Sequence, residues 1–521
     1  MLRTKNNTLL LYTMILYFSG LISCLIVAIP AKKIIISVPF ALIAKLFMCR
    51  YLKRYLSSFH TSSLKYKICC YFVATGISIL NCLNTAKYYI QIGISFAWLF
   101  IIICTFSVYY ITVFIHSIYH YFSKTGLYSL LKKLFLKKYV IAIFAIYVFS
   151  IGVICFKTNV FYDSIDVVYT FDNMPLMNLL FDPLDCDIKK PLFSLFSIPL
   201  YGFIPYLYIL QLPEQICSAV MITINSLYLI LANLLLSHIV FKDNYSSKKT
   251  LFFVMQLLTS AMMFGISAEH YNIAYFWMMI LIYQKVNTGK IDELPLLASA
   301  GSIITNFAFI PILFGINWKN VGKVLKHGLE YMLHFIVLIF ACGKFYYLIN
   351  FKNYVSVVGK FTSVDTSLIE KIQKYSHFLK NLFFLPDGYE TIVNDMPSWQ
   401  TVDQHGLSIL GIVILFACVV GFMLSRKEYI SNVAAYWVVF SIFIIVIGGW
   451  GIPENGLVLY TLYFGWAYVI LLFKFVYCIF EWLNNNRLLI AIPMISIILL
   501  LFVNIPSVIE IVQFAATKYP I

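Results

Sequence analysis

Charged residues are scarce in this sequence. Of its 521 residues, 12% are charged and 61% are hydrophobic, whereas about a quarter of the residues in an ordinary soluble domain are charged. This scarcity excludes a soluble fold. The segments of alternating polarity that are typical of outer-membrane β-barrels are also missing, so we expect membrane-embedded helices.

The sequence also lacks the motifs of several common sites. It has no CxxC pair, and most of its 12 cysteines lie inside apolar runs, where a free thiol behaves as a small hydrophobic side chain. No Gly-rich phosphate loop, HExxH motif or Walker pattern is present. The sequence therefore predicts neither a disulfide framework nor one of these known phosphate or zinc sites.

Long apolar runs are abundant. LLLYTMILYFSGLISCLIVAI and LSILGIVILFACVVGFML each approach the roughly 20 residues that a helix needs to cross a bilayer. The sequence predicts an all-α polytopic membrane protein with about 13 transmembrane helices plus partial or interfacial helices. The expected spans lie near residues 9–29, 33–49, 68–86, 92–116, 139–157, 218–240, 251–268, 270–285, 329–350, 406–424, 430–448, 457–478 and 488–508.

The distribution of basic residues predicts the orientation. The net charge is +16, and in membrane proteins an excess of Lys and Arg marks cytoplasmic loops, so we expect no nucleic-acid partner. The clusters at 50–67 and 124–138 place the amino terminus in the cytoplasm, with the first apolar run, residues 9–29, as a retained anchor. An integral protein of a bacterial plasma (inner) membrane is the simplest location, because no retention signal is present.

Two segments do not fit simple crossings. Residues 191–211 contain Pro191, Pro199 and Pro205, and prolines remove backbone donors, so we expect an interfacial or re-entrant helix. Residues 295–316 have basic residues on both flanks, which favours two half-length helices that break near Thr305 and Asn306.

This topology places three polar segments on one outer face. The loop at 158–190 has six aspartates, the turn at 269–270 carries Glu269 and His270, and GGWGIPENG joins two later spans. Lys189 and Lys190 are basic residues beside the aspartates and suit a phosphate group. Simple solvation of these loops, or contact with lipid headgroups, is the alternative explanation.

The order of these segments resembles a known family. An aspartate-bearing outer loop (FYDSIDVVYTFD), a basic-Pro-Leu element (KKPLFSLFSIPL) and an acid at a later outer turn (SAEHY) look like the glycosyltransferase C superfamily, near its protein O-mannosyltransferase and aminoarabinose transferase branch. The resemblance covers residues 135–480. It implies a glycosyltransferase C-like (GT-C) fold and inverting transfer of a sugar from a polyprenyl-phosphate donor to a lipid, glycan or protein acceptor.

The resemblance also implies roles for individual residues. Asp166 matches the family's first-loop acid and would be the general base, with Asp163 as its neighbour. Lys189 and Lys190 would hold the donor phosphate, although the family often has a histidine where Lys190 stands. Glu269 matches the later acid, which could orient sugar hydroxyls or a divalent metal; the sequence does not settle whether a metal takes part.

Other candidate residues carry weaker signals. His270 has no family counterpart, and an interfacial histidine without a special role is the simpler interpretation. In GGWGIPENG, Trp450 could stack on a sugar ring, and Glu454 and Asn455 could bind it through hydrogen bonds, or the segment could be a plain interhelical turn.

The expected organisation has four parts. Residues 1–135 form amino-terminal membrane helices of unknown role, 136–350 form the GT-C-like core with its first outer loop at 158–190, 351–405 form an outer loop or small cap, and 406–521 form carboxyl-terminal membrane helices. The expected partners are the polyprenyl-phosphate donor, an acceptor that the sequence does not identify, and membrane lipids. A transporter or flippase of a lipid-linked glycan, or a polysaccharide polymerase or ligase, stays open as an alternative.

Overall fold

A computed structural model shows a mostly helical protein with two short antiparallel hairpins in its described part. The structure describes residues 55–76, 97–165, 167–173, 190, 192–197, 206–207, 210–241, 246–314, 321–341, 359, 362–363, 366–402, 404–452, 457–482 and 487–521. The expected spans at 9–29 and 33–49 lie outside these residues.

The helices of the described part follow the apolar runs of the sequence. In chain order they are α4 (Ala97–Lys124), α5 (Leu127–Phe135), α6 (Lys138–Cys155), α8 (Phe193–Phe196), α10 (Glu214–Phe241), α11 (Ser246–Leu258), α12 (Ala261–Gly265), α13 (Tyr271–Thr288), α14 (Glu293–Ser302), α15 (Phe309–Phe314), α16 (Val321–Ala341), α19 (Leu368–Asn381), α20 (Ile409–Ser425), α21 (Tyr429–Ile442), α22 (Thr461–Trp482) and α23 (Leu488–Lys518). The 3-10 helices η2 (Ile304–Ala308) and η4 (Val458–Tyr460) and the π-helix η3 (Phe443–Ile447) join some of them.

Among the described residues, five helices are long and apolar enough to cross a membrane. They are Lys138–Cys155, Glu214–Phe241, Tyr429–Ile447, Val458–Trp482 and Ile490–Lys518. Their bounds agree with five of the expected spans to within a few residues, except that the last helix continues ten residues beyond the expected end at residue 508. By their length and composition these helices are compatible with an integral membrane protein, and the number of 13 spans stays a prediction.

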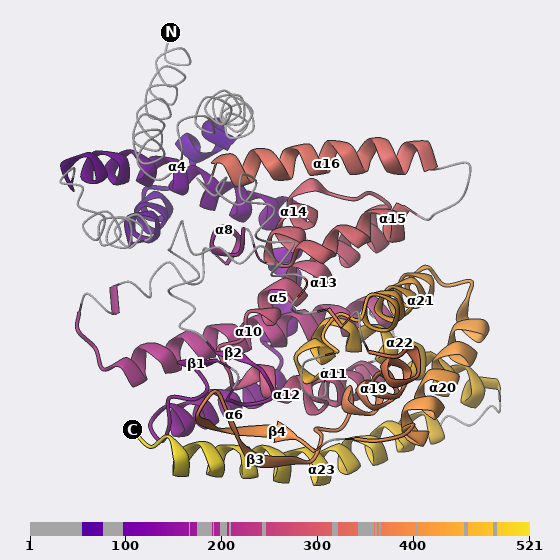
Figure 1. Ribbon diagram of the computed structural model, residues 1–521. Coiled ribbons are helices and arrows are strands. Elements are labelled where there is room, and N and C mark those ends of the chain that lie inside the picture. The colour runs from indigo at the N-terminus through magenta and orange to yellow at the C-terminus, as the bar shows by residue number, and fades with distance from the viewer. Residues whose placement is uncertain are drawn as a thin grey trace.

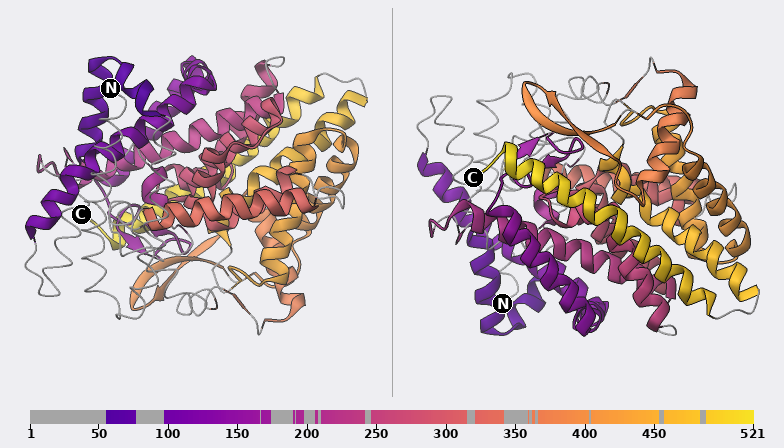
Figure 2. Two further views of the ribbon diagram at one scale, coloured as in Figure 1. Left: turned by 90° about the horizontal axis from the view of Figure 1, so that it is seen from above. Right: turned by 90° about the horizontal axis from the view of Figure 1, so that it is seen from below.

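The helices form a bundle in which α16 and α23 lie at opposite ends (Figure 1). Between them, α13 packs against α10 and α14, α10 packs against α6, and α22 packs against α20 and α21. Seen from below, α23 runs across one whole face of the molecule (Figure 2). Every residue of α13 from Tyr271 to Ile282 is buried, so this helix lies at the centre of the core.

The two hairpins lie together near the carboxyl-terminal end of α23. Strands β1 (Ser164–Ile165) and β2 (Asp172–Asn173) pair in the first outer loop, and β3 (Gly388–Val393) pairs with β4 (Met396–Thr401). The backbone of Trp399 joins them, because it donates to Val167 and accepts from Tyr169. The segment 351–405 thus contributes a helix and a hairpin, and the hairpin packs on the first outer loop.

One of three segments differs from expectation in detail, one agrees with it, and one favours one of two expected alternatives. The helix expected at 251–268 begins earlier, at Ser246, and breaks after Leu258, so α11 and α12 replace one straight span. The break expected near Thr305 and Asn306 is confirmed, because α14 ends at Ser302 and a 3-10 turn precedes α15. In the segment 191–211, Phe193 and Phe196 of the short helix α8 are buried inside the protein, which favours the re-entrant alternative over the interfacial one for that part.

Candidate functional site

The turn that carries Glu269 and His270 is built into the core. Both side chains are buried, at 0% and 2% exposed, so the alternative of simple solvation is wrong for this turn. The physical reason lies in two asparagines from neighbouring helices. The Asn225 amide on α10 donates to the carbonyl oxygens of Ser267 and Glu269, and the Asn272 amide on α13 donates to that of Phe264. These bonds satisfy a turn that has no helical partner for its carbonyl groups.

Lys190 lies beside this turn because the short helix α8, which follows it, is anchored to two other helices. The backbone amide of Leu192 donates to the carbonyl of Gly301 on α14 at 2.9 Å, and a Cβ on Gly301 would lie only 2.7 Å from the Leu192 Cβ. At the other end of α8, the Trp277 indole donates to the carbonyl of Phe196 at 3.0 Å. The close contact at Gly301 lets α8 lie deep in the bundle and directs Lys190, which is 6% exposed, toward α13.

Lys190, His270 and Glu269 form a buried cluster. The Lys190 Nζ lies 2.7 Å from the His270 Nδ1. This Nδ1 atom of His270 also contacts the Glu269 Oε1. A lysine ammonium only donates hydrogen bonds and a carboxylate only accepts them. A protonated His270 Nδ1 therefore donates to Glu269, whereas an unprotonated Nδ1 accepts from Lys190. The position of one proton decides which of the two contacts is a hydrogen bond.

Trp450 approaches this cluster from the other half of the bundle. The π-helix η3 ends α21 and brings the Trp450 backbone amide to 3.1 Å from the carbonyl of Ile444. Gly449 and Gly451 both have positive φ, 66° and 73°, which glycine adopts without strain. The chain therefore turns tightly on both sides of Trp450.

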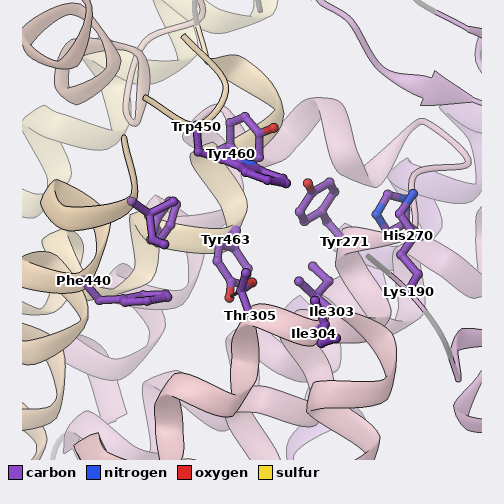
Figure 3. A pocket seen from close by; sticks show the side chains of 12 residues that line it. Lys190, His270, Tyr271, Ile303, Ile304, Thr305, Phe440, Trp450, Tyr460 and Tyr463 are labelled. Carbon is purple, nitrogen blue, oxygen red and sulfur yellow. Dashed lines mark hydrogen bonds between the residues drawn. The ribbon is translucent and has the colours of Figure 1, made fainter. Parts of the chain in front are cut away.

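A pocket of about 50 Å³ lies between these two halves, which is room for roughly four water molecules. Lys190 and His270 lie on one side of it and Phe440 on the opposite side, with Tyr271 between them (Figure 3). Three further lining residues carry hydroxyl groups, and the remainder are apolar or aromatic. The hydroxyl-bearing residues are Thr305, Tyr460 and Tyr463, and the others are Ile303, Ile304, Ile444, Trp450 and Phe464.

The helix break expected near Thr305 forms part of this wall. The Thr305 hydroxyl lies 2.8 Å from the Tyr463 hydroxyl, which also donates to the Asn306 side chain at 2.7 Å. The Asn306 amide donates back to the carbonyl of Ser299 at 3.0 Å. Side chains therefore replace the helical hydrogen bonds that the break removes, and they hold the pocket wall in one position.

The described residues 158–165 and 167–173 of the loop at 158–190 reach the turn before Glu269 and do not line the pocket. The Ala268 backbone amide donates to the carbonyl of Phe161 at 2.8 Å, so the loop is joined to the residue that directly precedes Glu269. Asp163 lies on this loop, is exposed, and does not line the pocket. Asp166, Lys189, Glu454 and Asn455 lie outside the described residues.

No family model, curated protein or solved structure matches this chain. Among the described residues, no group of three or more His, Cys, Asp or Glu side chains could hold a metal ion. The site therefore rests on its own geometry, in which Lys190, His270 and Trp450 line one pocket and Glu269 lies directly behind His270.

The sequence did not point to several residues that shape the site. No motif or spacing distinguished three of the lining tyrosines from the rest of the 38 in the sequence; they are Tyr271, Tyr460 and Tyr463. Asn225 carried a usable signal, because it is an amide inside the apolar run SAVMITINSLYLILANLLL. A polar side chain inside an apolar helix commonly faces the interior of a bundle and has a specific partner.

Proposed function

We propose that this chain is a membrane glycosyltransferase that transfers a sugar from a polyprenyl-phosphate donor to an acceptor hydroxyl. The observation that carries the proposal is the shared pocket of Lys190, His270 and Trp450. A buried cation beside a histidine suits a phosphate, and aromatic walls suit a sugar ring. Apolar side chains such as Ile304 and Phe440 complete the wall and suit the first part of a lipid chain.

The chemistry requires a single displacement. The acceptor oxygen forms a bond to the anomeric carbon, the bond from that carbon to the phosphate oxygen breaks, and the polyprenyl phosphate leaves with the electron pair. Lys190 would stabilise the charge that develops on the phosphate. The proton of the acceptor hydroxyl would pass to an acid of the first outer loop, for which Asp166 is the proposed base and Asp163 its neighbour.

Glu269 and His270 would position the phosphate-binding group. Because the His270 Nδ1 bonds either Glu269 or Lys190, a protonated imidazole held by Glu269 would release the Lys190 ammonium toward a bound phosphate. The amino terminus would lie in the cytoplasm of a bacterium and the pocket would open on the opposite side of its plasma membrane.

The test is transfer of radiolabelled sugar by membranes that contain the protein and a set of polyprenyl-phosphate donors. We expect Lys190→Ala to reduce transfer by about 100-fold, as removal of one charge-stabilising group commonly does. Lys157→Ala is the matched control, because Lys157 is exposed at the end of α6 and lies outside the pocket. Equal transfer by the two variants and the wild type would contradict the proposal.

One observation favours a second function, the transport of a lipid-linked glycan. The pocket lies at the discontinuity between α14 and α15, and transporters commonly bind their substrates where helices are interrupted. Proteoliposomes with a fluorescent lipid-linked glycan distinguish the two functions. Movement of the glycan across the bilayer without sugar transfer would favour the transporter.

A further inference from the structure

Helix α19 has three distinct sets of side chains. Tyr375, Phe378 and Leu379 are buried against the bundle. Glu370, Lys374 and His377 follow one another at i, i+4 and i+7, which places them on one polar stripe. A third set, Leu368, Ile369 and Ile372, is apolar and yet 60%, 71% and 44% exposed. These three lie in the first two turns, where Leu368 and Ile372 continue the face of Tyr375 and Leu379 and Ile369 lies beside them.

The position of α19 is fixed at the end of an apolar helix. The Ser408 backbone amide, at the amino end of α20, donates to the Ser376 hydroxyl at 2.9 Å. A Cβ on Gly411 would lie 1.8 Å from the Ser376 carbonyl oxygen, so the two helices touch through their backbones. Helix α19 therefore lies at the level where α20 begins.

The exposed side of α20 is also apolar. Ile409, Val413 and Phe416 lie at i, i+4 and i+7 and are 80%, 53% and 68% exposed. In a chain whose described part has five candidate membrane spans, an all-apolar exposed stripe on a 17-residue apolar helix faces lipid. Ile409, at the start of this stripe, directly follows Ser408, whose backbone amide bonds α19.

We propose that α19 is an interfacial helix whose edge of Leu368, Ile369 and Ile372 lies in the boundary between lipid headgroups and acyl chains. The bilayer itself covers this apolar edge. Apolar side chains with a polar stripe on the neighbouring face are the arrangement of helices that lie in the plane of a membrane surface. Glu370 then points toward water, while Lys374 and His377 contact the backbone carbonyls of Ile452 and Gly406. This proposal does not depend on glycosyl transfer.

The helix also contacts the turn that places Trp450. The Lys374 ammonium donates to the carbonyl of Ile452 at 3.1 Å, and a Cβ on Gly449 would lie 3.1 Å from the Lys371 Nζ. The element that lies on the bilayer is therefore in direct contact with one wall of the pocket. A substrate that is anchored in the membrane would meet α19 beside the pocket.

The experiment introduces a photocrosslinking amino acid at Ile369 in the full-length protein in phospholipid vesicles and detects lipid adducts by mass spectrometry. Ile409, at the lipid-facing start of α20, is the positive control, and Glu370 on the polar stripe is the matched negative control. We expect adducts at Ile369 at a yield within about threefold of Ile409 and at least tenfold above Glu370. All three positions are exposed, so the substitutions leave the core intact.

Two outcomes would overturn the proposal. A yield at Ile369 as low as that at Glu370 would show that the edge faces water. Crosslinks from Ile369 to a second copy of the protein, without lipid adducts, would show that a protein surface covers it. Adducts at Ile409 in the same preparation ensure that a low yield at Ile369 reflects its position.

Discussion

At the scale of single residues, the Nδ1 atom of His270 has two neighbours of opposite charge. It contacts the Glu269 carboxylate and lies 2.7 Å from the Lys190 ammonium, and all three groups are buried. Buried ionic groups are kept only where they are paired, because removal of one partner leaves an uncompensated charge. A change at any one of the three therefore alters the other two.

Substitution of Glu269 separates its charge from its shape. We expect Glu269→Gln to reduce sugar transfer at least tenfold, because the amide keeps the size of the side chain but no longer holds a protonated imidazole. The turn should keep its shape, since the amide still accepts from the His270 backbone amide, which lies 3.0 Å from the Glu269 Oε1, but the melting temperature should fall because the buried Lys190 loses its countercharge. Transfer at the wild-type rate would show that the carboxylate charge is not needed.

His377 predicts a pH dependence of stability. Burial lowers the pKa of His377 below its usual value, and the nearby charge of Lys380 lowers this pKa further, while the carbonyl of Gly406 acts in the opposite direction. The unfolded chain therefore binds a proton at this position more readily than the folded protein does. Its stabilising contribution is complete above about pH 6.5, the pKa of an unperturbed histidine, and is lost as the pH falls toward the lowered pKa.

The measurement is thermal unfolding of wild type and His377→Gln in detergent between pH 5 and pH 8. We expect the difference in melting temperature between the two proteins to shrink or reverse at the acidic end, because only the wild type loses stability through this group. Parallel curves over the whole range would contradict the assigned pKa shift.

At the scale of elements, the interrupted helix α14–η2–α15 depends on side-chain hydrogen bonds. Tyr463 on α22 bonds both Thr305 and Asn306 at the break. We expect Tyr463→Phe to lower the free energy of unfolding by about 1–3 kcal/mol, because Asn306 loses a buried partner. Tyr436→Phe is the matched control, since Tyr436 on α21 is 45% exposed, and its effect should stay within about 0.5 kcal/mol.

Element bounds were predictable where local composition decides them. The apolar runs predicted α6, α10 and α22 closely, because a run of apolar residues reports helix length directly. The burial of Glu269 and His270 was not predictable, since the bonds that hold their turn come from Asn225 and Asn272 in other segments. The proximity of Lys190, His270 and Trp450 was predictable, because the expected topology placed all three on the same face of the membrane.

At the scale of the whole molecule, the two ends of the bundle differ in charge. At one end, Lys474 pairs with Glu428 at 2.6 Å, and Lys248 lies over the ring of Tyr477. The turn between α20 and α21 adds Arg426 and Lys427 at this end. The pocket and the β3–β4 hairpin are connected instead with the opposite ends of α20 and α21. Positive residues favour the cytoplasmic side.

Insertion of short epitope tags tests this orientation. We expect a tag after Lys427 to bind antibody only in permeabilised cells. A tag after Asn394, in the β3–β4 turn, should bind antibody in cells whose plasma membrane is intact and accessible to the antibody. The Asn394 site tolerates an insertion because it is in a hairpin turn with positive φ rather than in a packed element. The reverse pattern would invert the orientation, and equal accessibility would contradict it.

The burial of α13 has a consequence for how the protein is made. A helix whose residues from Tyr271 to Ile282 touch only protein gains little from contact with acyl chains, and it carries Asn272 and Gln284, which lipid does not solvate. During synthesis, transfer of this segment alone from the insertion machinery into lipid would therefore be unfavourable. We expect it to be retained there until α10 and α14 are available, so that the centre of the bundle is assembled last although it lies in the middle of the chain.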